Sequence, residues 1–191
     1  MTQIRAFIAI PVDENVRDLA SSIVKNLATA GADVKWVELE NLHLTLKFLG
    51  NISTDMVDRI SGVIEEATAH INQFEVTIEG IGGFPGGKKP LRVIWLGICD
   101  KSGLMERISS TIEEGCRKLG FKSEERGFKP HLTIGRVRQG SPNLTKLKSA
   151  ISLVEFNPLK LSIDRVNLMR SELSPRGPTY TVLRTFGLKK E

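Results

Sequence analysis

The chain has 191 residues, of which 40% are hydrophobic and 26% are charged. A chain of this composition buries a sizeable core, so a disordered protein is excluded, and the length suits a single domain. Lysine and arginine (27) outnumber aspartate and glutamate (22), which gives a net charge of +5. This small excess favours anionic partners, although ordinary solubility also requires charge.

The sequence does not support a membrane-spanning or secreted protein. No window approaches the roughly 18 apolar residues of a transmembrane helix, and the opening MTQIRAFIAI has the pattern of a buried strand rather than of a signal peptide. Two cysteines, Cys99 and Cys116, are too few for a disulfide framework, and we expect both to pack in the interior. These features predict a cytoplasmic protein in a reducing environment with no membrane partner. We expect a monomer, although no sequence feature specifies the oligomeric state.

The first half of the chain predicts a strand, a helix, a second strand and a second helix. The strand covers residues 4–10, and the helix after it has Asp13 as a candidate N-cap. Its apolar residues recur at three- and four-residue steps, at Val16, Leu19, Ile23, Leu27 and Ala30. The second strand begins at His43. The second helix, with Ser53 as its expected cap, has an apolar face of Met56, Val57, Ile60, Val63, Ile64 and Ala67.

The second half adds strands and two further helices. Residues 73–84 alternate apolar and polar residues, which is typical of a half-buried antiparallel strand, and a Gly/Pro/Lys loop leads to a strand at 91–98. A helix follows with Leu104, Ile108, Ile112 and Leu119 on one face and Gly120 as its end. After a strand at 131–134 and a short helix at 144–151, residues 159–173 and 178–188 predict two strands joined by the loop SPRGP.

The two halves repeat one arrangement of elements. Each reads strand, helix, polar connector, and then a strand that begins His-Leu-Thr, and the two histidines, His43 and His131, are 88 residues apart. We therefore expect one α+β domain over residues 1–191. It would consist of two intertwined, pseudo-symmetric lobes of antiparallel sheet, with helices on their outer faces and a central cleft.

Side chains alternate between the two faces of a strand, which assigns the motif residues to faces. In HLTLKF, regular alternation places His43, Thr45 and Lys47 on one face, whereas Leu44, Leu46 and Phe48 point to the core. In the second motif, His131 and Thr133 share a face. Regular alternation puts Arg136 on the core face, so it joins the site only if the strand bulges or ends first.

The paired motifs carry a recognisable chemistry. Imidazole titrates near neutrality, so two of them can act in opposite protonation states, one as base toward water and one as acid toward a leaving oxygen. The hydroxyls of Thr45 and Thr133 can donate hydrogen bonds to phosphate oxygens, and Lys47 with Arg136 or Lys129 can offset negative charge. The reaction that fits is in-line displacement at a phosphodiester without a metal or other cofactor.

Other kinds of active site have weaker support. The acids near the motifs, Glu38, Glu40, Glu124 and Glu125, have no familiar metal-ligand spacing. The sequence contains neither G-x-S-x-G nor a G-x-x-x-x-G-K-[ST] loop.

Several further residues have two readings. His70 suits the C-terminal end of a helix, and Trp36 is open to substrate contact. The basic loop at 86–90 with Arg92 is either an RNA contact or a soluble loop. Three aromatic residues can stack on a base, although core packing is the expectation for them: Phe7, Phe48 and Tyr180.

Four segments, in order along the chain, resemble those of a known family: RAFIAI, NLHLTLKFLGNI, FKPHLTIGRV and NLMRSELSPRGPTYTVL. The chain is similar to the two-histidine phosphoesterases. Within them it resembles the branch of RNA 2′,3′-cyclic phosphodiesterases (2′-5′ RNA ligases, LigT-like).

The resemblance implies a bilobal fold and metal-independent opening of a 2′,3′-cyclic phosphate at an RNA end or on a nucleoside, leaving a 2′-phosphate. It implies that His43 is the general acid, that His131 is the general base, and that Thr45 and Thr133 hold the phosphate. Ligation at 2′-5′ junctions is a second activity of such a site. Two alternatives stay open: a non-catalytic RNA-binding module that keeps the cleft, and a cyclic-nucleotide or ADP-ribose-derived cyclic phosphate as substrate.

Overall fold

All nine strands of the described residues belong to one antiparallel sheet. The computed structural model describes residues 2–86, 89–124, 127–175 and 177–190. The sheet has the order β7-β4-β5-β6-β3-β1-β8-β9, with β2 alongside β6. The strands are β1 (Gln3–Pro11), β2 (Val34–Trp36), β3 (His43–Ser53), β4 (Phe74–Phe84), β5 (Val93–Cys99), β6 (His131–Val137), β7 (Leu159–Ile163), β8 (Arg165–Ser174) and β9 (Gly177–Gly187). The helices are α1 (Glu14–Ala28), α2 (Met56–Thr68), α3 (Leu104–Lys118) and α4 (Leu144–Ser152), with a 3-10 turn η1 (Leu39–Asn41).

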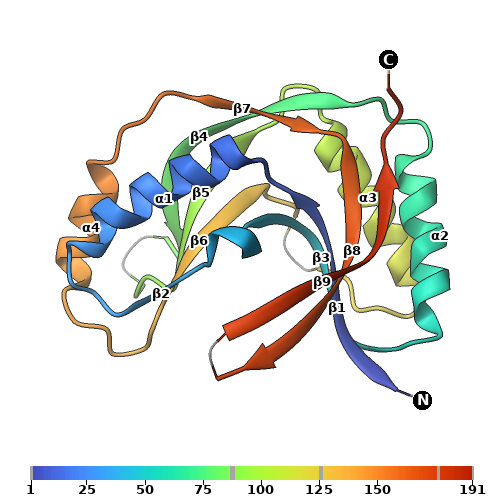
Figure 1. Ribbon diagram of the computed structural model, residues 1–191, viewed down its shortest axis with the longest axis horizontal. Helices are drawn as coiled ribbons and strands as arrows, with labels where there is room; N and C mark the ends of the chain where they lie inside the picture. Colours follow the sequence, from blue (N-terminus) through green and yellow to red (C-terminus); the bar gives the residue numbers. More distant parts are fainter. Residues whose placement is uncertain (1, 87–88, 125–126, 176, 191) are drawn as a thin grey trace.

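The sheet divides into two lobes at its centre, as the repeat predicts. Strands β7-β4-β5-β6 form one lobe and β3-β1-β8-β9 the other, and β3 pairs with β6 through a single residue pair, Leu44 with Leu132. Figure 1 shows α1 and α4 at the first lobe and α2 and α3 at the second. Helix α1 follows a strand of the second lobe and α3 follows a strand of the first, so the chain crosses between the lobes.

The connection from β7 to β8 makes the sheet curl. These strands lie near opposite ends of the strand order, yet only Asp164 separates them. Residues 159–173 are therefore two strands in different lobes, and the prediction of a single strand is wrong. The corner is closed by backbone hydrogen bonds from Leu188 to Asp164 (2.8 Å) and from Gln73 to Lys189 (2.8 Å).

The helices bury the faces that the periodicity predicts. In α1 the buried residues are Val16, Ala20, Ile23 and Leu27, and in α3 they include Met105, Ile108, Ile112 and Cys116. Each fully buried large apolar side chain contributes about 1.5–3 kcal/mol, so these faces fix the helices on the sheet. Asp13 caps α1 by accepting a hydrogen bond from the Val16 amide (3.0 Å), as predicted.

Ser53 does not cap the helix after it. It is the last residue of β3, where it pairs with Gln3, and α2 begins at Met56 after Asp55. The pairing with β1 extends the strand past the position where the sequence places a helix start.

Within the described ranges, no helix combines the length and apolar character needed to cross a membrane.

Candidate active site

The two His-Leu-Thr motifs meet where the lobes join. Leu44 of β3 and Leu132 of β6 are direct antiparallel partners. Continuing that register by one residue places His43 opposite Thr133 and the other threonine, Thr45, opposite the second histidine. The flanking residues face away from the two buried leucines, so all four polar side chains lie on one face of the sheet. Diagonal positions of this kind are roughly 7–8 Å apart, with somewhat less between their Cβ atoms, so the two imidazoles are close enough to contact one small anion.

Both imidazoles are oriented by the same local contact. Nδ1 of His43 lies 2.7 Å from the carbonyl oxygen of Asn41, and Nδ1 of His131 lies 2.8 Å from that of Lys129. A carbonyl oxygen only accepts, so Nδ1 of each ring carries a proton and donates it. The Nε2 atom of each ring is therefore the one left to give or take a proton.

Aromatic rings and one arginine set the environment of His43. Its ring centroid lies 4.8 Å from that of Phe7 and 5.3 Å from that of Tyr180. Burial holds the pKa of His43 below its usual value of 6.5; the bond to the Asn41 carbonyl opposes this shift, and the positive charge of Arg136 adds to it. The free site thus favours the neutral form of this ring.

A second aromatic group lies beside His131. The ring of Phe84 is 5.4 Å from the imidazole in an edge-on arrangement and 5.1 Å from the ring of Trp95. Trp95 lies flat against β4, since a Cβ on Gly82 would come within 2.5 Å of its ring. No local sequence pattern indicates Phe84 or Trp95, because their place in the site follows from the pairing of β5 with β6 and with β4.

A bulge turns Arg136 toward the site. In the β5–β6 ladder Thr133 pairs with Trp95 and Arg136 pairs with Val93, so Ile134 is the extra residue. Trp95 and Val93 are two residues apart on β5, so their side chains lie on the same face of the sheet. Their partners Thr133 and Arg136 therefore also lie on one face. This is the condition under which the sequence allowed Arg136 to take part.

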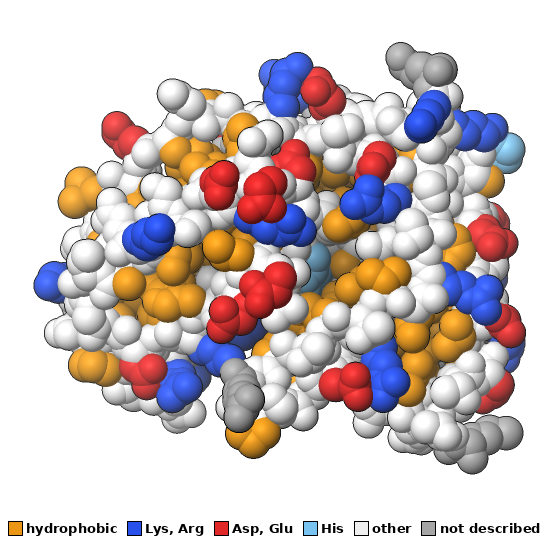
Figure 2. Space-filling view, in the orientation of Figure 1, with side chains coloured by type: hydrophobic (Ala, Val, Ile, Leu, Met, Phe, Trp, Pro, Cys, Tyr) orange, Lys and Arg blue, Asp and Glu red, His pale blue; other side chains and the backbone are white. Residues whose placement is uncertain are grey.

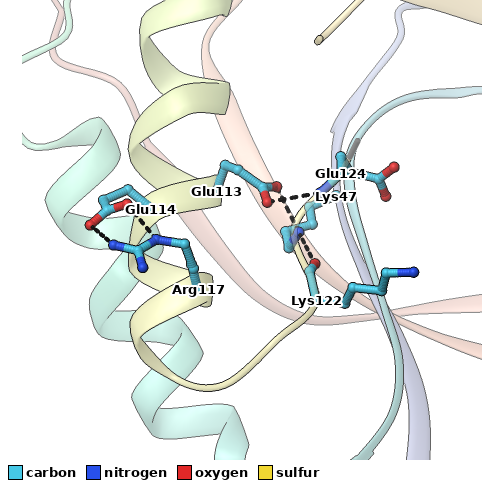
Figure 3. Close-up of polar contacts among 6 residues, drawn as sticks. All are labelled: Lys47, Glu113, Glu114, Arg117, Lys122 and Glu124. Atoms are coloured by element: carbon cyan, nitrogen blue, oxygen red, sulfur yellow. Dashed lines mark hydrogen bonds and ion pairs between the residues drawn. The ribbon is translucent and has the colours of Figure 1, made fainter. Parts of the chain in front are cut away.

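Lys47 lies on the opposite face from the histidines, and its predicted position beside the phosphate is wrong. A bulge at Leu46 shifts the register, so that Lys47 pairs with Ile8 on the helix-covered face. Its side chain is 1% exposed, and its ammonium donates to Oε2 of Glu113 (2.6 Å) and to the carbonyl of Lys122 (3.1 Å), as Figure 3 shows. Lys47 thus fastens β3 to α3 and to the segment that leads to the second motif.

The same bulge brings Phe48 out of the core. Its predicted burial is wrong, because it is 54% exposed and pairs with Phe7, whose ring lies 6.2 Å from its own. Phe7 is buried, as expected, whereas Tyr180 is half-buried with its ring 4.9 Å from that of Phe7. Burial also raises the pKa of Tyr180 against the opposing charges of Arg136 and Arg5, so its hydroxyl keeps its proton and can donate.

The remaining candidate residues lie away from the motif face or outside the described chain. Trp36 packs against the hydrophobic core, and Lys129 is exposed. His70 is exposed just after α2. Gly87 and Lys88 of the basic loop, and also Glu125, lie outside the described residues.

The described residues form no metal site, and charged side chains of one sign do not gather on the face that contains the central imidazole. Over residues 2–86, 89–124, 127–175 and 177–190, no three or more His, Cys, Asp or Glu side chains form a group that could hold a metal ion. Figure 2 shows acidic and basic side chains interspersed over one face of the molecule, with an imidazole near its centre. This face therefore presents no broad field of one sign.

The sequence comparisons identify the family of this chain, and a solved structure matches its fold. The family model described as "2'-5' RNA ligase superfamily" matches residues 8–175. An RNA 2′,3′-cyclic phosphodiesterase of Methanothermobacter thermautotrophicus is 38% identical over 97% of this chain and 100% of its own length. One of Archaeoglobus fulgidus is 36% identical over 95% of this chain and 99% of its own. The crystal structure of TT0787 of Thermus thermophilus superposes with a TM-score of 0.81 at 26% identity and covers 98% of this chain and 100% of that one. The chain belongs to the 2′-5′ RNA ligase superfamily.

Proposed function

We propose that the chain is a metal-independent RNA 2′,3′-cyclic phosphodiesterase that opens the terminal cyclic phosphate of RNA to a 2′-phosphate. The observation that carries the proposal is the antiparallel register of the two motifs around Leu44 and Leu132, with Nδ1 of each imidazole bound to a backbone carbonyl. The relatives that share almost the whole chain carry the same activity in their names.

The proposed reaction is one in-line displacement. Nε2 of His131 takes a proton from a water molecule, whose oxygen attacks phosphorus opposite the 3′ oxygen. The bond from phosphorus to the 3′ oxygen breaks, and that oxygen takes a proton from Nε2 of His43. The products are a 2′-phosphate and a 3′-hydroxyl. The assignment of acid and base to the two rings follows the family resemblance.

Three further side chains stabilise the phosphate in this scheme. The hydroxyls of Thr45 and Thr133 donate to its non-bridging oxygens, and Arg136 offsets the charge that develops on them. The negative charge of the bound phosphate also raises the pKa of His43, which counters the effects of burial and of Arg136 and favours the acid form needed for catalysis.

The same site accommodates 2′-5′ ligation. If an RNA 5′-hydroxyl replaces water, the same attack on phosphorus and the same loss of the 3′ oxygen produce a 2′-5′ linkage. Hydrolysis and ligation then share both histidines and differ only in which hydroxyl enters. Water is present at far higher concentration, so hydrolysis is the main reaction.

The direct test is hydrolysis of adenosine 2′,3′-cyclic phosphate in the presence of EDTA, with the product identified by phosphorus NMR. We expect full activity with the chelator and only the 2′-phosphate as product. Salt-sensitive RNA binding without turnover would instead support the non-catalytic module. An ADP-ribose-derived cyclic phosphate, assayed in parallel, tests the alternative substrate class.

A further inference from the structure

A pocket opens beside His43, on the side away from β6. It has a volume of about 370 Å³, within the range of small-ligand sites, and combines the cleft-facing ends of β1, β8 and β9 with residues of η1 and α1. His43 and Tyr180 form one wall, so the pocket adjoins the proposed phosphate position. The catalytic scheme above uses His43 alone among the residues that line it.

Two buried polar atoms in this pocket lack partners. Asn167 is 6% exposed, and its Oδ1 accepts no hydrogen bond from any described residue; Nε of Arg17 is also buried and donates to none. Asn167 pairs with Ala9 on the cleft-facing side of the sheet, and both line the pocket. Buried polar groups in folded proteins nearly always have partners, so this pair of atoms points to a ligand with a donor and an acceptor.

The charge of the pocket fits a phosphate group. Arg17 on α1 and Arg165 on β8 both line it. Among the described residues, each has an ion pair with one carboxylate, Glu14 (3.1 Å) and Asp164 (2.7 Å) respectively. A guanidinium has five N–H donors, so one carboxylate contact leaves others for a phosphate. The acid that lines the pocket, Glu40, is exposed and has water to solvate it.

The direction of the RNA chain follows from the in-line geometry, and this step rests on the proposed function. If His43 protonates the departing 3′ oxygen, that side of the ribose faces His43. From the 3′ carbon the sugar continues through its 4′ and 5′ carbons to the 5′-phosphate. The nucleotide before the cyclic end is therefore directed past His43, where the pocket opens.

We infer that this pocket binds the phosphodiester and ribose of the nucleotide that precedes the cyclic end. Arg17 and Arg165 hold the phosphodiester, and Oδ1 of Asn167 accepts a hydrogen bond from the ribose 2′-hydroxyl. The preferred substrate is then an oligoribonucleotide 2′,3′-cyclic phosphate rather than a mononucleotide.

The test compares kcat/KM for adenosine 2′,3′-cyclic phosphate with that for the dinucleotide ApA ending in a 2′,3′-cyclic phosphate. The wild type should prefer the dinucleotide by about tenfold or more, since each hydrogen bond to a charged group is worth about that factor. Arg17→Gln and Asn167→Leu should each remove most of this preference and change the mononucleotide rate by less than about twofold. Arg59→Gln, on the distant helix α2, is the matched control and should keep the preference.

Two further measurements separate binding from structure. Leucine has the same side-chain branching as asparagine and removes an amide whose oxygen has no partner among the described residues, so Asn167→Leu should not lower the melting temperature, as it would if that oxygen stabilised the fold. For the wild type, a dinucleotide whose first sugar is deoxyribose should lose the part of the preference that depends on Asn167. The Asn167→Leu variant should hydrolyse the deoxyribose and ribose dinucleotides equally well. Equal wild-type rates on mononucleotide and dinucleotide would overturn the inference, as would a loss in Arg17→Gln that is the same for both substrates.

Calorimetric binding of ApA 2′-phosphate and adenosine 2′-phosphate repeats the comparison without turnover. Tighter binding of the dinucleotide, lost in Arg17→Gln, supports the pocket even if no substrate is hydrolysed, in which case only the proposed function fails. Equal binding of the two ligands counts against the pocket whatever the hydrolysis assay gives.

Discussion

Replacement of Lys47 by methionine separates a structural role from a phosphate-binding one. Methionine keeps most of the length of the apolar stem and removes the ammonium, so the bonds to Glu113 and to the Lys122 carbonyl are lost. Breaking a fully buried ion pair costs about 3–5 kcal/mol. Here the Glu113 side chain is 29% exposed and can regain water, so we expect a smaller loss of stability, about 2 kcal/mol.

The assay measures thermal unfolding and kcat/KM on the same samples. For a domain of this size, 1 kcal/mol lowers Tm by about 2–4 °C, so Lys47→Met should lower it by about 4–8 °C. Activity measured well below Tm should fall by less than about threefold. The exposed Lys148→Met is the control for loss of a lysine charge and should change neither quantity.

Glu113 provides the matched partner variant. In Glu113→Gln the amide oxygen can still accept from the Glu124 amide, which now donates to Glu113 at 3.1 Å. The double variant with Lys47→Met should be more stable than the sum of the two single losses predicts, because neither buried charge is left without its partner. An unchanged Tm in Lys47→Met together with a tenfold or larger fall in kcat/KM would refute this reasoning and indicate that Lys47 binds the phosphate.

Two further variants and one chemical modification test where individual side chains lie. Phe48→Ala should leave Tm nearly unchanged, because the ring is 54% exposed, and raise KM by roughly fivefold or more if the ring stacks on a base; a loss of about 3–5 kcal/mol in stability would mean that Phe48 is a core residue. Arg136→Gln removes a charge that lowers the pKa of His43, so the His43 titration followed by proton NMR, and with it the alkaline limb of kcat/KM, should move to higher pH; a shift to lower pH would contradict the arrangement. Burial raises the pKa of Cys116 to about 11, so iodoacetamide near pH 8 should modify this thiol only after denaturant unfolds the protein.

The elements and the paired motifs were predictable because they depend on local pattern. The segments whose apolar residues recur at three- and four-residue steps do form helices, and the spacing of the two repeats identifies both strands that begin at histidine. The same holds for the faces of His43, Thr45, His131 and Thr133, since two residues of regular alternation are enough to assign them.

For the residues that follow the first three of each motif, the face of the sheet on which each side chain lies depends on bulges. In β3 the bulge at Leu46 is set by pairing with β1, and no residue in HLTLKF signals it, so Lys47 and Phe48 were assigned to the wrong faces. In β6 a signal exists. Gly135 interrupts the strand, and glycine inside a strand often marks a bulge or a close approach. Here a Cβ on Gly135 would come within 2.8 Å of the Trp36 ring.

The pocket beside His43 and the aromatic group beside His131 could not be predicted from local pattern. Arg17 lies in α1, whereas Arg165 and Asn167 lie far along the chain in β8, and they line one pocket because β8 pairs with β1, the strand that leads into α1. Such long-range contacts depend on strand order, which the alternation of side chains does not specify.

The most direct test of two-imidazole catalysis is the hydrolysis rate of adenosine 2′,3′-cyclic phosphate by His43→Ala, His131→Ala and the double variant, with folding checked by circular dichroism. We predict that each single variant loses about 10²–10⁴-fold in kcat, and that the double variant loses much less than the product of the two, because the rings act in one step. Activity above about a tenth of wild type in either single variant would show that the two rings do not act together on one phosphorus atom.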